Sequence, residues 1–79
     1  MRIEIFGTGC RKCQRLEKHV EEAVDELSIK ADIEKVEDIS EIAERGVMKT
    51  PSLAIDGEVK ISGRVPSKNT IKELLKENQ

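Results

Sequence analysis

The spacing of apolar residues changes twice in the first half of the chain, and this constrains the fold most. Residues 1–6 alternate Ile3 and Ile5 with polar neighbours, which predicts a strand, and residues 31–36 predict a second one. Between them, residues 11–27 predict a helix with one apolar face. That face comprises Leu16, Val20, Ala23, Val24 and Leu27. A strand, a helix and a strand in this order predict two parallel strands joined by a right-handed crossover.

The second half predicts a short helix, a hairpin and a last helix. Asp38 and Glu41 resemble a capping box before a helix that ends near Gly46. Asp56-Gly57 separates two β-rich runs, which is a strong hairpin signal, and Ser67 can cap the last helix. The expected order is βαβαββα: an α/β fold with a mixed four-stranded sheet and helices on both faces. The expected core is Ile3, Ile5, Leu16, Val20, Val24, Ile33, Leu53, Ile55, Ile61, Ile71 and Leu74.

Length and composition exclude several classes of function. Seventy-nine residues predict one domain over residues 1–79, expected to be monomeric. A net charge of −2 and a single aromatic residue, Phe6, provide neither a basic surface nor stacking platforms for nucleic acid. The apolar runs are too short to span a membrane, and no signal peptide is recognised. We therefore expect a cytoplasmic protein, in which disulfides are usually transient or catalytic.

Both cysteines of the chain, Cys10 and Cys13, fall where the first strand gives way to the first helix. The helix N-terminus and the neighbouring Arg11 and Lys12 favour a thiolate, so we expect the pKa of Cys10 to be lowered. Cys13, one turn later, is expected on the inward face of the helix. An exposed attacking sulfur above a buried resolving sulfur is the arrangement that two-step thiol–disulfide exchange requires. Thr8 and Gly9 are expected to shape access to the Cys10 sulfur.

Other readings of the cysteine pair remain open at this point. Buried cysteines are often inert. Two thiolates also suit Cu(I), so the same pair fits a soft-metal carrier, whereas a closed zinc site needs two more ligands. His19 is the only nearby nitrogen ligand, and we expect it to be a solvated surface residue.

Three features together resemble the thioredoxin/glutaredoxin superfamily, in particular its small redox-active disulfide proteins. They are "GTGCRKC" after the first strand, "TP" directly before the hairpin, and a closing helix. The resemblance implies a minimal thioredoxin fold and a thiol–disulfide oxidoreductase. It also implies a cis peptide bond before Pro51, although an X-Pro bond taken alone is expected to be trans. The backbone of Thr50 is expected to pair with the substrate, so that Thr50 and Pro51, with Thr8 and Gly9, are the expected substrate-binding residues. Heavy-metal-associated domains follow βαββαβ order without this proline, which weighs against the metal carrier.

The chain departs from that family's patterns in ways that bear on mechanism. Arg11-Lys12 replaces Gly-Pro or Pro-Tyr between the cysteines, and two cations are expected to make the protein more oxidising. Thioredoxins carry a buried carboxylate six residues before the first cysteine, a position held here by Glu4. Glu4 is either a base for Cys13, on the sheet face opposite Ile3 and Ile5, or a partly exposed strand residue paired with a Lys or Arg. We favour the second reading.

The resemblance also implies partners. A reductase of the thioredoxin-reductase type and disulfide-containing protein substrates are expected, with no bound cofactor and no metal. The alternative is glutathione, as in glutaredoxins, with Ser62-Gly63 forming the flanking turn and Arg11 or Lys12 holding a carboxylate.

Overall fold

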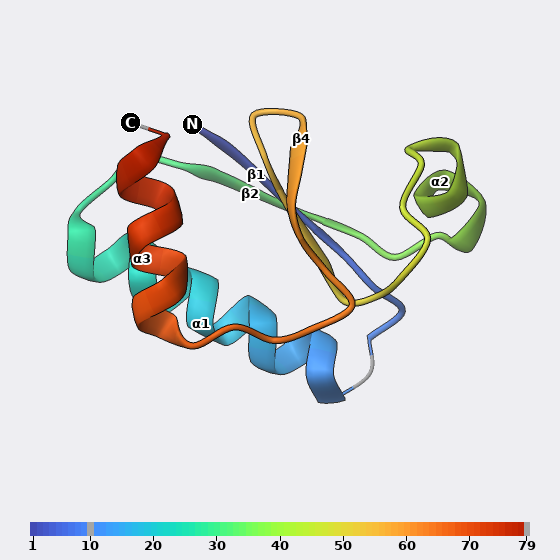
Figure 1. Cartoon of the computed structure of the whole chain (residues 1–79), viewed down its shortest axis with the longest axis horizontal. Coiled ribbons are helices and arrows are strands. Elements are labelled where there is room, and N and C mark those ends of the chain that lie inside the picture. The colour runs from blue at the N-terminus through green and yellow to red at the C-terminus, as the bar shows by residue number, and fades with distance from the viewer. Residues whose placement is uncertain (10, 79) are drawn as a thin grey trace.

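The computed structural model describes residues 1–9 and 11–78, and its elements follow the expected order (Figure 1). They are β1 (Arg2–Phe6), α1 (Arg11–Leu27), β2 (Asp32–Val36), α2 (Ile39–Glu44), β3 (Ser52–Ile55), β4 (Glu58–Ser62) and α3 (Lys68–Glu77). None of the helices in the described part of the chain is both long and apolar enough to cross a membrane. The expected βαβαββα order is confirmed.

The four strands form one mixed sheet in the order β2-β1-β3-β4. β1 and β2 are parallel, with Ile3 opposite Ile33, as the crossover predicted. β1 and β3 are antiparallel, and β3 and β4 form the expected antiparallel hairpin. Asp56 and Gly57 both have positive φ, at 50° and 86°, which is the backbone that a two-residue type I′ turn requires.

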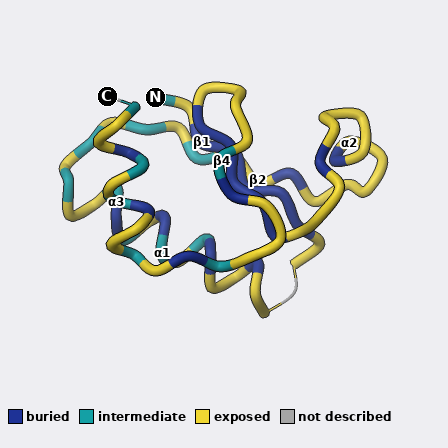
Figure 2. Tube along the Cα trace, in the orientation of Figure 1, coloured by how far each residue is buried: buried dark blue, intermediate teal, exposed yellow. Residues whose placement is uncertain are grey.

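Two helices, α1 and α3, cover one face of the sheet and enclose the larger core (Figure 1). The odd-numbered side chains of β1 point to this face because side chains alternate along a strand. The buried members of this core are Ile3, Ile5, Leu16, Val20, Ala23, Leu53, Ile55, Ile61, Ile71 and Leu75. The sheet at the centre and the facing sides of the helices are buried, whereas the turns are exposed (Figure 2).

The opposite face of the sheet carries a second, smaller core under α2. Its buried members are Phe6, Val36, Ile42, Val47 and Ala54. Ile42 is the buried residue of α2, and Figure 1 shows this helix away from α1 and α3. Helices on both faces of the sheet are therefore confirmed.

The expected core was wrong at its margins. Val24, Ile33 and Leu74 are only partly buried and pack against the larger core from its edge. Ile33 lies on the edge strand β2. In α3, Leu75 is buried in place of Leu74, since it lies four residues after Ile71 on the same helical face.

Charged side chains also pair between α1 and α3 at the surface. Glu26 of α1 pairs with Lys68 and Lys72 of α3, at 2.5 Å and 3.2 Å. Hydrogen bonds from Lys68 and Lys72 lower the pKa of the Glu26 carboxyl. The hydrogen bond between Lys68 and Glu26 also raises the pKa of the Lys68 ammonium. Ser67 caps α3 as predicted, since its side chain accepts from the Thr70 N–H.

Candidate redox site

The turn between β1 and α1 holds the sulfur of Cys13 against the backbone of Gly7. Cys13 is 6% exposed and belongs to the buried stripe of α1, as its spacing predicted. A Cβ atom added at Gly7 would lie 2.3 Å from Cys13 Sγ and 3.0 Å from Cys13 Cβ. The Gly7 N–H donates to the Val36 carbonyl at 3.0 Å, so β2 fixes this backbone. Only a residue without a side chain leaves room for the sulfur here.

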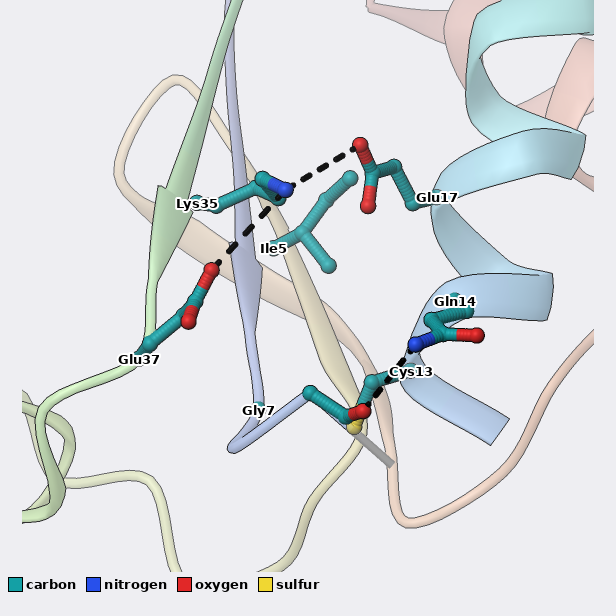
Figure 3. Close-up of a pocket in the computed structure, with 8 residues that line it drawn as sticks. Ile5, Gly7, Cys13, Gln14, Glu17, Lys35 and Glu37 are labelled. Carbon is teal, nitrogen blue, oxygen red and sulfur yellow. Dashed lines mark hydrogen bonds and ion pairs between the residues drawn. The ribbon is translucent and has the colours of Figure 1, made fainter. Parts of the chain in front are cut away.

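Beside Cys13 lies a cavity of about 210 Å³ between α1 and the ends of β1 and β2 (Figure 3). Its polar side chains are Gln14, Glu17, Lys35 and Glu37, and its remaining walls come from Ile5, Gly7 and Gly9. Lys35 Nζ lies between two carboxylates, 3.4 Å from Glu17 Oε1 and 3.8 Å from Glu37 Oε1. The cavity therefore joins the buried thiol to a cluster of three charges.

The Thr50–Pro51 peptide bond is cis, as the resemblance implied. Pro51 is buried, whereas Thr50 is exposed. Two contacts hold this segment: the buried Ser52 hydroxyl donates to the Lys49 carbonyl, and the Gly63 N–H donates to the Pro51 carbonyl at 2.9 Å. Gly63 is thus packed against the proline segment.

Thr8 and Thr50, two of the four predicted substrate-binding residues, line one groove on the α2 side of the molecule. The groove measures about 270 Å³, and its other lining residues are apolar. They are Ile39, Ile42, Ala43, Val47 and Met48. Ile39 and Met48 are 73% and 92% exposed, and exposed apolar side chains that gather in one groove are typical of an interaction surface. Gly9 lines the cavity beside Cys13 instead.

The charged residues around the cysteine pair are arranged against the helix macrodipole. Arg11 and Lys12 are exposed in the first turn of α1, which contains no acidic residue. Macrodipoles favour acidic side chains at this end of a helix, so cations here cost stability and favour an anion nearby. Cys10 itself, the predicted attacking residue, lies outside the described residues.

Glu4 is buried on the α2 face, away from the cavity beside Cys13. It is 1% exposed, so the expectation of a partly exposed residue was wrong, although its partners are arginines as expected. Arg45 Nη2 lies 2.5 Å and Arg2 Nη2 lies 3.5 Å from Glu4 Oε2. Among the described residues, Glu4 Oε1 has no hydrogen-bond partner. Arg45 also lies over the Phe6 ring at 5.7 Å from its centroid, which ties α2 to β1.

His19 is half-buried rather than solvated. Its Nδ1 lies 3.0 Å from the Pro66 carbonyl, which can only accept, so the Nδ1–H donates. The bond links α1 to the loop before α3, a role that its position in the sequence did not reveal.

The comparisons with known proteins agree with this geometry. The family model described as a thioredoxin domain matches residues 1–76. The chain belongs to the thioredoxin family. It is 53% identical over 75 residues to a thioredoxin of Methanothermobacter thermautotrophicus, covering 95% of this chain and 97% of that protein. It is 50% identical over 74 residues to a thioredoxin of Methanocaldococcus jannaschii, covering 94% and 85% respectively.

A solved thioredoxin has the same overall fold. Thioredoxin 1 from Thermosipho africanus superposes with a TM-score of 0.61 at 25% identity, covering the whole of both chains. The expected minimal thioredoxin fold is therefore confirmed, and the protein is a thioredoxin-like redox protein.

For this thioredoxin-family protein, sequence reasoning missed the charged cluster of Glu17, Lys35 and Glu37. One signal was available, since Glu17 lies four residues after Cys13 and so shares its helix face. The contribution of Lys35 and Glu37 depends on how β2 aligns beside β1, where Lys35 lies opposite Ile5. No local pattern encodes that register.

Proposed function

We propose that this protein reduces protein disulfides by dithiol exchange through Cys10 and Cys13. The observation that carries the proposal is the Cys13 sulfur, buried against Gly7 in the first turns of α1. A resolving thiol must be shielded from outside reagents, yet lie beside the attacking cysteine. Cys10 comes three residues earlier in the sequence, immediately before α1.

In the proposed mechanism, the Cys10 thiolate attacks one sulfur of a substrate disulfide. The substrate's other sulfur leaves as a thiolate, and a mixed disulfide forms on Cys10. Cys13 then attacks the Cys10 sulfur, which releases the second substrate sulfur and leaves Cys10–Cys13 oxidised. Arg11 and Lys12, in a first helical turn without acidic residues, favour the attacking thiolate by their charge.

The substrate is held beside Cys10 by the segment around Pro51. Thr50 is exposed, so its backbone can pair with an extended substrate chain, in the manner of strand addition. Thr8 and Gly9 border the approach. The groove under Ile39 and Met48 accommodates an apolar substrate side chain next to the disulfide, since it is continuous with Thr8 and Thr50.

A separate enzyme of the thioredoxin-reductase type restores the dithiol, and the chain acts as a single cytoplasmic domain, as a monomer and without a cofactor of its own. Gly63 lies against the Pro51 segment, as a glutathione-binding turn would. Glutathione as the reductant stays the alternative, and it is tested by supplying each reductant in turn.

Trapping tests the proposal directly. Cys13→Ser removes the resolving sulfur, so partners should accumulate on Cys10 as mixed disulfides that a reducing agent releases. Mass spectrometry identifies the adducts and the attachment site. Cys10→Ser in an otherwise identical chain is the matched control and should trap little, because Cys13 is buried. Equal trapping by both variants, or none by Cys13→Ser, would refute the proposed mechanism.

A further inference from the structure

The charged cavity beside Cys13 has no part in the exchange steps described so far. Before Cys13 can attack, its thiol must lose a proton, because the thiolate is the nucleophile. Cys13 is 6% exposed, which restricts direct proton transfer to bulk water. The acceptor is therefore to be sought among the groups that share the cavity with the sulfur (Figure 3).

Three titratable groups besides Cys13 line this cavity among the described residues: Glu17 from α1, Lys35 from β2 and Glu37 directly after β2. Ile5 of β1 and the glycines after this strand, Gly7 and Gly9, do not titrate. Lys35 is the cation of the set and is paired with both carboxylates. The proton acceptor is then one of two glutamates.

Glu17 is the better placed of the two. It follows Cys13 by four residues, so both side chains lie on the same face of α1. Its side chain is 26% exposed, against 58% for Glu37, so Glu17 is the more enclosed in the cavity. Lys35 holds Glu17 Oε1 at 3.4 Å, which fixes the carboxylate at the cavity wall (Figure 3). A cavity of about 210 Å³ has room for several water molecules at about 30 Å³ each.

We propose that Glu17 accepts, through cavity water, the proton that Cys13 releases when it resolves the mixed disulfide, and that Lys35 is its positioning residue. This rests on the proposed dithiol exchange. The Cys13 proton moves to the Glu17 carboxylate as the Cys13 sulfur bonds to the Cys10 sulfur. The bond from Cys10 to the substrate sulfur breaks, and its electron pair leaves with that sulfur. Cys10 and Cys13 are oxidised and the substrate disulfide is reduced. Glu17 then passes the proton to the departing thiolate or to solvent.

A pH jump isolates this step. The full chain, carrying a chromophoric thionitrobenzoate on Cys10, is prepared in acid, where resolution is slow, and is mixed into buffers from about pH 6 to about pH 10. Release of the chromophore reports attack by Cys13. In Glu17→Gln, we expect release to slow by about tenfold or more near neutral pH. This lower bound is smaller than the roughly hundredfold or more that a well-matched general base usually contributes to a rate. The gap should close towards about pH 10, where hydroxide takes the proton instead.

Four further variants separate a proton acceptor from a structural role. Glu21→Gln makes the same charge change one helical turn farther from Cys13 and should behave as the parent. Glu17→Asp keeps the carboxylate and should recover part of the rate, whereas Lys35→Met should shift the pH profile less than Glu17→Gln. Glu4→Gln tests the buried carboxylate on the opposite face of the sheet and should leave the profile unchanged.

Several outcomes overturn the proposal. They are a Glu17→Gln profile that superimposes on that of the parent, an equal effect of Glu21→Gln, or an effect of Glu4→Gln in place of Glu17→Gln. If the parent itself releases no chromophore after the jump, then it is the dithiol exchange that fails, which distinguishes the two proposals.

Discussion

Gly7→Ala should separate the stability of this fold from its redox chemistry. The added methyl group would lie 2.3 Å from Cys13 Sγ, whereas non-bonded heavy atoms rest at about 3.5 to 4.0 Å. The two atoms must therefore separate by more than about 1 Å. The Gly7 backbone is bonded to Val36, so we expect the Cys13 side chain or the first turn of α1 to move instead.

Overpacking of this kind costs about 2 kcal/mol, from a usual range of about 1 to 3. In a domain of this size, that free energy lowers the Tm by roughly 8 to 16 °C. A displacement of about 1 Å at a reacting atom can slow a step by about a hundredfold. We therefore expect Gly7→Ala to slow resolution of the Cys10 mixed disulfide by about ten- to a hundredfold, with attack by Cys10 less affected.

Gly57→Ala is the matched control for this prediction. Gly57 lies in the β3–β4 turn with φ of +86°, and nothing lies within 4 Å of an added Cβ. The left-handed backbone alone costs alanine about 1 to 2 kcal/mol, so the two variants should lose similar stability. Thermal unfolding and the pH-jump release of thionitrobenzoate are measured on both. If both variants resolve the mixed disulfide at the same rate, the close packing of Cys13 against Gly7 has no functional role.

Three other changes test separate parts of the structure. Arg45→Met should destabilise the protein by about 2 kcal/mol in urea unfolding, because it leaves the buried Glu4 carboxylate without this charged partner. The loss should be smaller than the roughly 3 to 5 kcal/mol of breaking a fully buried pair, since Arg45 is 38% exposed. Adding Glu4→Gln should restore most of the lost stability. Glu26→Gln should flatten the acid limb of stability against pH. Because the pKa of Glu26 is lowered, its bond to Lys68 stabilises the fold at pH values above the ordinary pKa of 4.5, and this stabilisation is lost as the pH falls through the folded-state pKa. Equal slopes of unfolding free energy against acidic pH for parent and variant would contradict this. Met48→Lys changes a groove side chain that is 92% exposed, and it should raise the KM for a protein disulfide severalfold. The rate with a small aromatic disulfide should not change. An unchanged KM for the protein disulfide would exclude the groove as a docking surface.

The sequence was informative wherever local spacing determines structure. Helical periodicity placed Cys13 on the inward face of α1, and Asp56-Gly57 identified the hairpin turn. Ser67 and Asp38 act as N-caps where the pattern put them. These features depend on neighbours within a few residues, so the chain can encode them one segment at a time.

Features that depend on contacts between distant segments were not visible in the same way. Gly7 could be read as a flexible turn residue, yet its role is to leave space for the Cys13 sulfur. Buried Glu4 is paired with Arg45, which is 41 residues away and reaches it from the end of α2. Lys35 meets Glu17 only because β2 aligns in parallel beside β1.

The most direct test of the whole account is the rate at which each thiol is alkylated as a function of pH. The reduced chain is treated with iodoacetamide at graded pH, and peptide mass spectrometry assigns the adducts to Cys10 or Cys13. We expect Cys10 to react first, by about tenfold or more at neutral pH, with a reactivity midpoint below the value of about 8.5 for a free thiol. Two sulfurs that react alike, each with the midpoint of an ordinary thiol, would contradict the account.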